Sequence, residues 1–84
     1  MTKEEIFNKL SDMLVEQFEI VKEKITLEAN IVNDLDLDSI DMIDLIATLR
    51  RESNISFTPE DYKNVRTIAN IVDAIYNKLN ENKN

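Results

Sequence analysis

The sequence predicts an all-α fold with three substantial helices, one short helix and a long first connection. The chain has 84 residues, no glycine and a single proline, a composition that favours helices joined by polar connections. Apolar residues recur at helical spacing in three separate stretches. A chain of this length buries only about 60–65% of its unfolded surface, so we expect one domain over residues 1–84 with a single thin core.

The first helix is predicted over residues 3–18. Thr2 followed by Glu5 is typical of a capping box, and Met1 and Ile6 are placed for the accompanying hydrophobic staple. Apolar side chains then recur at helical spacing at Ile6, Phe7, Leu10, Met13, Leu14 and Phe18. They predict an amphipathic helix of about four turns with a structural role.

The connection over residues 19–37 has no clear periodicity. Its apolar residues can pin it onto a core at Val21, Ile25, Leu27, Ile31, Val32, Leu35 and Leu37. Structureless loops of about twenty residues are uncommon in compact domains unless they serve a function. We therefore expect a short helical turn within this segment and a role for it in the site that follows.

The second helix is predicted to begin at Asp38, a favoured N-cap residue, and to end near Ser53. At about 100° per residue, one apolar arc faces the core with Ile43 at its edge; this arc consists of Met42, Leu45, Ile46 and Leu49. The opposite side carries Ile40, Asp41, Asp44, Ala47 and Arg51. Two apolar side chains thus stand among charges on the solvent face, which is unusual for a purely structural helix.

The last two helices have recognisable start signals. Thr58 followed by Pro59 predicts a short third helix of one or two turns. Thr67 can cap a fourth helix, which is predicted to end near residue 79 before a polar tail over residues 80–84. Its apolar stripe consists of Ile68, Ile71, Val72, Ile75 and Leu79.

Composition and charge exclude several kinds of function. The chain has no cysteine and no histidine, so it lacks a disulfide framework, a thiolate and the commonest general base. Its net charge of −7 is concentrated in residues 28–44, which hold six acidic and no basic residues, against 11 acidic and 10 basic residues elsewhere. Such a segment repels nucleic acid and attracts basic protein surfaces.

The sequence gives no sign of membrane insertion or of secretion. No apolar run approaches the roughly 20 residues that cross a bilayer, and residues 1–10 lack the hydrophobic segment of a secretory signal. We expect a soluble, cytoplasmic and monomeric protein.

The candidate site is the acidic run from Asp34 to Asp41, in which Ser39 follows its capping aspartate at the first turn of the second helix. Free N–H groups and the positive end of the helix dipole favour an anionic group esterified to that hydroxyl. The surrounding carboxylates oppose such a phosphate, so we assign them to the recruitment of a basic partner.

Residues 25–40, ITLEANIVNDLDLDSI, resemble the loop and attachment site of bacterial acyl carrier proteins, and the similarity extends from about residue 3 to 79. The resemblance implies a four-helix bundle and places Ser39 where the family receives 4′-phosphopantetheine from coenzyme A, through a phosphopantetheinyl transferase (holo-acyl-carrier-protein synthase). It also implies that the second helix is recognised by partner enzymes. The residues matched to that role, together with the capping aspartate, are Asp38, Ile40, Asp41, Asp44 and Ala47.

The family resemblance implies a carrier that is not an enzyme, which delivers acyl chains as thioesters to synthases and other acyl-transferring enzymes. Fatty acid biosynthesis is the expected pathway. A specialised polyketide, peptide or lipid pathway, or an unmodified acidic helical protein-binding module, is the alternative. Part of the core is expected to line a space for the acyl chain, with candidates at Leu10, Leu14, Ile46, Leu49, Ile71 and Ile75.

Three features depart from the family pattern. Asp36 stands where the family usually has glycine, so its backbone must be tolerable for another residue. Arg50 and Arg51 replace acids that are common near the end of the second helix, which reverses the charge at one edge of the recognition face. Ser53 stands where an aromatic core residue is frequent, which predicts a repacked or weaker core at that end.

Two other chemistries fit the site poorly. Asp34, Asp36 and Asp38 match the first ligand positions of a calcium-binding EF-hand loop, but Ser39 replaces its glycine and Leu45 its bidentate glutamate, leaving at most loose cation binding. A hydrolase with Ser39 as nucleophile would lack a histidine base and has no lysine nearby in sequence. Taken alone, the Asp-Ser pair would be an ordinary capped helix start.

Overall fold

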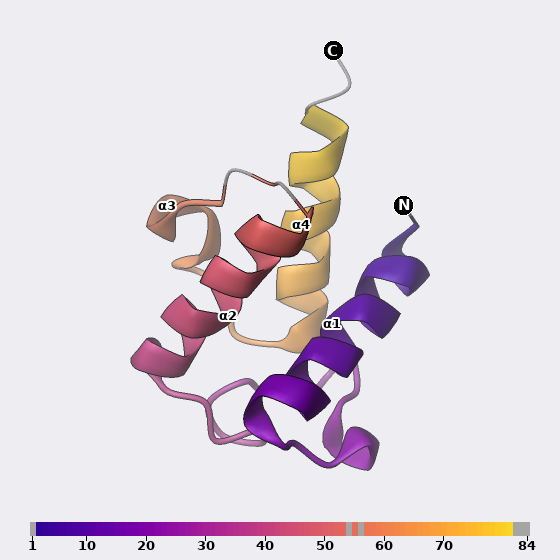
Figure 1. Ribbon diagram of the computed structural model, residues 1–84, viewed down its shortest axis with the longest axis vertical. Coiled ribbons are helices and arrows are strands. Elements are labelled where there is room, and N and C mark those ends of the chain that lie inside the picture. The colour runs from indigo at the N-terminus through magenta and orange to yellow at the C-terminus, as the bar shows by residue number, and fades with distance from the viewer. Residues whose placement is uncertain (1, 54, 56, 82–84) are drawn as a thin grey trace.

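The computed structural model describes residues 2–53, 55 and 57–81. These residues form four α-helices, α1 (Lys3–Phe18), α2 (Ser39–Ser53), α3 (Pro59–Tyr62) and α4 (Ile68–Glu81), together with a 3-10 turn, η1 (Lys22–Lys24) (Figure 1). Within them no strand forms, and the only β-type pairing is an isolated antiparallel bridge between Asn30 and Thr67. The all-α prediction is confirmed, with the predicted order of three longer helices and one short one.

The capping box predicted at the start of α1 is present. The backbone N–H of Glu5 donates to Thr2 Oγ1 at 3.1 Å, and the backbone N–H of Thr2 donates to Glu5 Oε1 at 2.8 Å. This contact from the Thr2 backbone, followed by the Thr2 hydroxyl, lowers the pKa of Glu5. The predicted staple involves Met1, which lies outside the described residues.

The long connection contains the predicted helical turn, η1, but only some of its apolar residues are anchors. Ile25, Ile31, Leu35 and Leu37 are buried. The prediction was wrong for Val21, Leu27 and Val32, which are more than half or about half exposed. A connection covers the core with one side only, so neighbours such as Ile31 and Val32 cannot both point inward.

Backbone hydrogen bonds tie this connection to the segment that precedes α4. The N–H of Ile31 donates to the carbonyl of Arg66 at 2.9 Å, and the N–H of Ile68 donates to the carbonyl of Ala29 at 3.0 Å. The N–H of Ala69 donates to the carbonyl of Leu27 at 2.8 Å. The connection is therefore held in place by hydrogen bonds as well as by its buried side chains.

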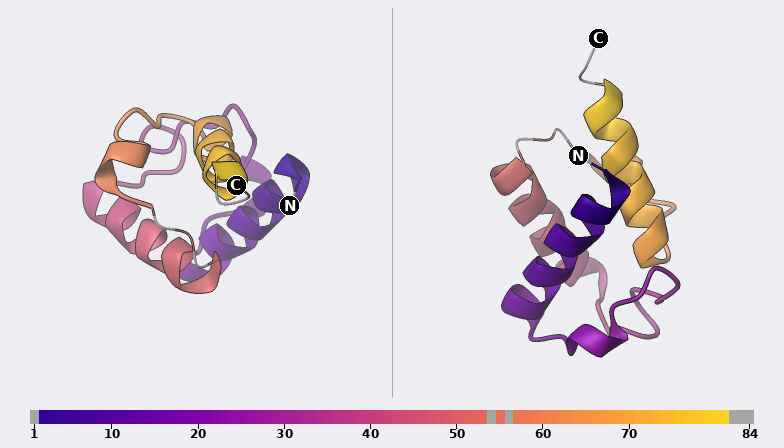
Figure 2. Two further views of the ribbon diagram at one scale, coloured as in Figure 1. Left: turned by 90° about the horizontal axis from the view of Figure 1, so that it is seen from above. Right: turned by 90° about the vertical axis from the view of Figure 1, so that its right-hand side faces the viewer.

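The core lies between two pairs of helices. α1 and α4 lie side by side, α3 packs against α4, and α2 and α3 occupy the other side of the bundle (Figure 2). Most of the predicted core residues are buried, including Leu10, Leu14, Ile46, Leu49, Ile71 and Ile75. The stripe residues Phe7, Phe18, Met42 and Leu79 are half-buried and pack against this core. Ile55 and Phe57 are also buried, although their segment has no helical periodicity by which the sequence could mark them.

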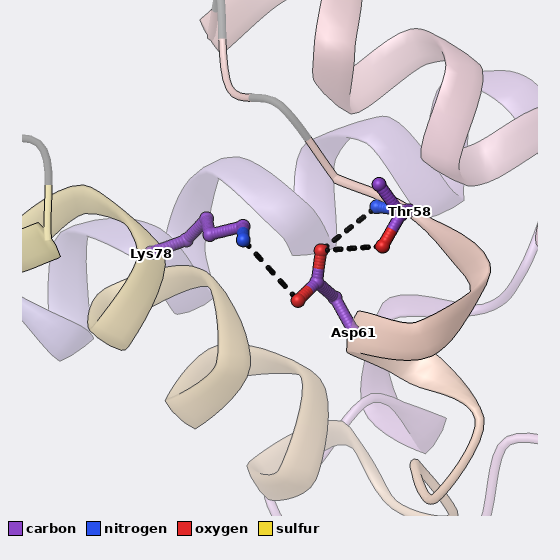
Figure 3. Close-up of polar contacts among 3 residues, drawn as sticks. All are labelled: Thr58, Asp61 and Lys78. Atoms are coloured by element: carbon purple, nitrogen blue, oxygen red, sulfur yellow. Dashed lines mark hydrogen bonds and ion pairs between the residues drawn. The ribbon is translucent and has the colours of Figure 1, made fainter.

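Asp61 joins α3 both to Thr58, the residue that precedes this helix, and to Lys78 of α4. Its Oδ2 accepts hydrogen bonds from the backbone N–H and the hydroxyl of Thr58, both at 2.9 Å, and its Oδ1 lies 3.2 Å from Lys78 Nζ on α4 (Figure 3). The Phe57 and Tyr62 rings stack with centroids 6.2 Å apart. This short helix thus depends on one carboxylate and one ring pair.

α4 begins as predicted and ends later. The N–H of Asn70 donates to Thr67 Oγ1 at 3.2 Å, and the N–H of Thr67 donates to Asn70 Oδ1 at 3.1 Å, so Thr67 caps the helix. The helix continues to Glu81, two residues beyond the predicted end. The rest of the predicted polar tail, residues 82–84, lies outside the described residues.

Candidate functional site at the start of α2

Ser39 is the first residue of α2, and its side chain is exposed. Asp38 caps the helix as predicted, because its Oδ1 accepts the backbone N–H of Asp41 at 2.9 Å and its carbonyl accepts the N–H of Met42 at 3.0 Å. The N–H of Asp38 in turn donates to Asp41 Oδ2 at 3.1 Å. The two aspartates therefore close a reciprocal box around the serine.

This box gives Asp38 and Asp41 a structural role. The sequence predicts Asp38 as the cap but gives Asp41 a role in partner recognition alone. The spacing of three residues, the same that marked Thr2 and Glu5, was the signal that could have found the second half of the box. Half-buried Asp41 thus uses one carboxylate oxygen on the backbone of its own helix.

The backbone reverses its direction immediately before the site. Asp36 has φ 59°, in the left-handed region, where glycine is favoured because a Cβ atom is strained and aspartate is among the better tolerated alternatives. On its two sides Leu35 and Leu37 are buried while Asp36 is exposed. A left-handed residue at this position accounts for the glycine that the family usually has there. Here Asp36 replaces that glycine and adopts the same kind of turn.

Asp34 belongs to a turn of its own. Its Oδ2 accepts the backbone N–H of Asn30 at 2.7 Å, while Asn30 Oδ1 accepts the N–H groups of Val32 and Asn33 at 3.0 and 2.8 Å. Across residues 2–53, 55 and 57–81, no three acidic side chains are gathered in a way that could hold a metal ion. Of the acids that resemble an EF-hand in sequence, Asp34 and Asp38 bond instead to nearby backbone N–H groups.

The outer face of α2 carries the predicted mixture of apolar and charged side chains. Ile40 is 69% exposed, and Asp44, Ala47 and Arg51 are also exposed. Ile43, predicted at the edge of the core stripe, is 57% exposed and joins this face. On the helix's flank, Thr48 Oγ1 donates to Gln17 Oε1 of α1 at 2.9 Å.

The site fits a covalently attached anionic group. The Ser39 side chain is exposed, and its position at a helix N-terminus places it at the positive end of the dipole. The nearest carboxylates, Asp38 and Asp41, each accept a backbone N–H, so one oxygen of each is already hydrogen-bonded within the first turn. A polar arm esterified to the Ser39 hydroxyl would begin at the protein surface.

Comparison with known proteins agrees with this geometry. A family model described as a phosphopantetheine attachment site matches residues 8–75. An acyl carrier protein of Lactobacillus johnsonii is 40% identical over 80 residues, which cover 95% of this chain and all of that one. The chain belongs to the acyl carrier protein family. An acyl carrier protein of Petrotoga mobilis is 31% identical, covering 95% and 94% of the two chains.

Solved structures of acyl carrier proteins have the same fold. The crystal structure of one from Thermotoga maritima matches with a TM-score of 0.84 and 23% identity, covering 96% of this chain and 94% of that one. The Enterococcus faecalis acyl carrier protein, whose structure was linked to high thermal stability, matches with a TM-score of 0.74 and 29% identity, covering 93% and 99%. The four-helix prediction is thereby confirmed.

Membership defines the general chemistry of the chain. An acyl carrier protein holds a covalent 4′-phosphopantetheine group, carries acyl chains to synthase and transferase enzymes, and has no catalytic activity of its own. In the part of the chain that the structure describes, every helix is too short or too polar to cross a membrane.

Proposed function

We propose that Ser39 is the attachment residue and that the chain carries acyl groups for fatty acid biosynthesis in the cytoplasm. The exposed hydroxyl at the first position of α2, inside the Asp38–Asp41 box, is the observation that supports this site. It lies within the matched residues 8–75. When bound, the phosphopantetheine arm supplies the thiol that this cysteine-free chain lacks.

The surrounding residues have separate tasks in this proposal. Asp38 and Asp41 fix the first turn, so Ser39 is presented to a phosphopantetheinyl transferase in one defined position. Exposed Asp44 steers basic partner surfaces, with Asp38 and Asp41 adding to the same field. Ile40 and Ala47 give the partner apolar contact. The protein acts as a monomer with one carrier domain over residues 1–84.

The attachment is tested by mass. The purified protein, coenzyme A and a phosphopantetheinyl transferase are incubated, and the intact protein is weighed; we expect the gain of one arm. Ser39→Ala abolishes the gain. Ser53→Ala, which removes a hydroxyl from the other end of α2, is the matched control and keeps it.

A wild-type protein that gains no mass with several competent transferases would contradict the proposal and favour an unmodified protein-binding module. Gain of an arm by Ser39→Ala would place the attachment elsewhere. The pathway is tested on protein recovered from its own cells, where mass spectrometry of the attached groups should show saturated chains that grow by two carbons. Aminoacyl or polyketide groups would contradict the fatty acid assignment.

A further inference from the structure

The exposed face of α2 changes the sign of its charge along the helix. Asp44 lies in the first half of α2, while Arg50 and Arg51 lie in its last turn, and all three side chains are exposed. At a rise of about 1.5 Å per residue, Arg51 lies about 10 Å beyond Asp44 and about 18 Å beyond Ser39 along the helix axis. The two charges are thus far enough apart to meet different groups on a partner.

These charges share one stripe with the exposed apolar side chains. At about 100° per residue, Asp44, Ala47 and Arg51 lie within about 40° of Ile40 around the helix. Arg50 lies on the Ile43 side of this stripe. Glu52, which is also exposed, lies about 120° from Ile40 and so outside it. The stripe therefore carries exposed isoleucine and negative charge in its first half, Ala47 next, and positive charge at the other end.

The described part of the chain supplies no ion pair to this face. Its ion pairs join other elements, at Lys3 with Asp73, Lys63 with Glu60, and Lys78 with Asp61. Arginines in the last turn of a helix are favoured by its dipole, which accounts for their position but not for the exposed isoleucines in the first half of the same face. Apolar side chains rimmed by charges are typical of an interaction surface.

We infer that α2 binds a partner enzyme whose surface is divided in the same way, with basic groups opposite Asp44 and acidic groups opposite Arg50 and Arg51. This inference rests on the proposed function, since the partner is an enzyme that acts on the group carried by Ser39. A uniformly basic surface would attract the first half of α2 but repel its last turn, so the two arginines select against it.

Affinity measurements test the sign of this interaction. The probe is an acyl-transferring synthase purified from the same organism, titrated with the phosphopantetheine-loaded protein. Arg51→Glu should weaken binding about threefold to tenfold, and Arg50→Glu should act in the same direction. Lys9→Glu makes the same change of net charge at an exposed position on α1. This control should leave the affinity within about twofold of wild type.

Tighter or unchanged binding by Arg51→Glu would overturn the inference, because a uniformly basic partner gives tighter binding and an indifferent one gives no change. If the wild type gains the arm and binds the synthase, while Arg51→Glu binds as tightly or more tightly, the inference fails but the proposed function still stands. Absence of mass gain on the wild type would instead contradict the function itself. A wild-type dimer that Arg51→Glu dissociates in sedimentation would assign the face to a second copy and also overturn the inference.

Discussion

Asp36 adopts a left-handed backbone conformation that costs a residue with a Cβ atom more than it costs glycine. Asp36→Gly should therefore raise the free energy of unfolding by about 0.5–1 kcal/mol, measured by urea denaturation. Asp36→Val should lower it, because β-branched side chains fit this region poorly. Asn33→Gly, in the neighbouring turn at negative φ, should not stabilise the protein. Equal effects of the two glycines would contradict the backbone explanation.

Ser11 is a polar residue inside the core. Its side chain is 3% exposed, and its Oγ has no hydrogen-bond partner among the described residues. Ser11→Ala should raise the free energy of unfolding by about 1 kcal/mol, since it removes an unsatisfied hydroxyl and improves helix propensity. Ser53→Ala, at a half-buried position in α2, should gain less. A destabilised Ser11→Ala protein would show that the hydroxyl does find a partner.

At the scale of single elements, α3 depends on the ionised form of Asp61. The Thr58 backbone N–H, with help from its hydroxyl and from Lys78, lowers the pKa of Asp61 from its ordinary value of 3.8. A lowered pKa in the folded state contributes stability above the unfolded pKa, and this contribution is lost as the pH falls through the folded pKa.

Asp61→Asn should therefore melt at a lower temperature than wild type near neutral pH, and the difference should shrink as the pH falls below about 4. Thermal melts followed by circular dichroism from neutral pH to about pH 2 measure this. Glu60→Gln, which breaks an exposed ion pair with Lys63 in the same helix, should have little effect. A difference that stays constant with pH would show that charge is not its cause.

The start of α2 combines capping with charge, and two substitutions separate them. Asp38→Ala should cost about 1 kcal/mol of stability because it removes the cap, and it should also slow modification of Ser39. Asp44→Ala removes the same charge without a capping bond, so it should slow modification while leaving the melting temperature nearly unchanged. Modification of the wild type should weaken with added salt. A rate that is indifferent to salt would argue against electrostatic steering.

At the scale of the whole molecule, the thin core is expected to admit an acyl chain between its side chains. Each buried methylene contributes about 0.8 kcal/mol, so a medium-length acyl group should raise the melting temperature above that of the phosphopantetheine-loaded protein. An acetyl group is the control, because it is too short to reach far into the core. Equal melting temperatures for both loads would contradict insertion.

The helices could be predicted because their signals are local. Thr2, Asp38 and Thr67 each precede an apolar stripe, so both the start and the buried face of α1, α2 and α4 follow from the sequence. The position of Ser39 followed in the same way from its capping aspartate. These features depend on neighbours within a few residues, which a single sequence displays.

Features that depend on distant contacts could not be predicted. Ile55 and Phe57 are buried because the segment that carries them packs against the helical bundle. Ile43 is exposed because the side of α2 on which it lies does not face the core. The left-handed conformation of Asp36 was indicated only by the resemblance, which places glycine there, because aspartate itself also occupies many other backbone conformations. Each needs the packed arrangement of all four helices.

The bridge between Asn30 and Thr67 has a mechanical consequence. Residues 31–66, which carry α2 and α3, leave the long connection and return to it at nearly the same place, because Ile31 bonds to Arg66 there. The segment is therefore a closed loop whose two ends are tied to each other beside the start of α4. Loosening of α2 and α3 at one end of the loop is thus opposed by the bonds that hold the other end.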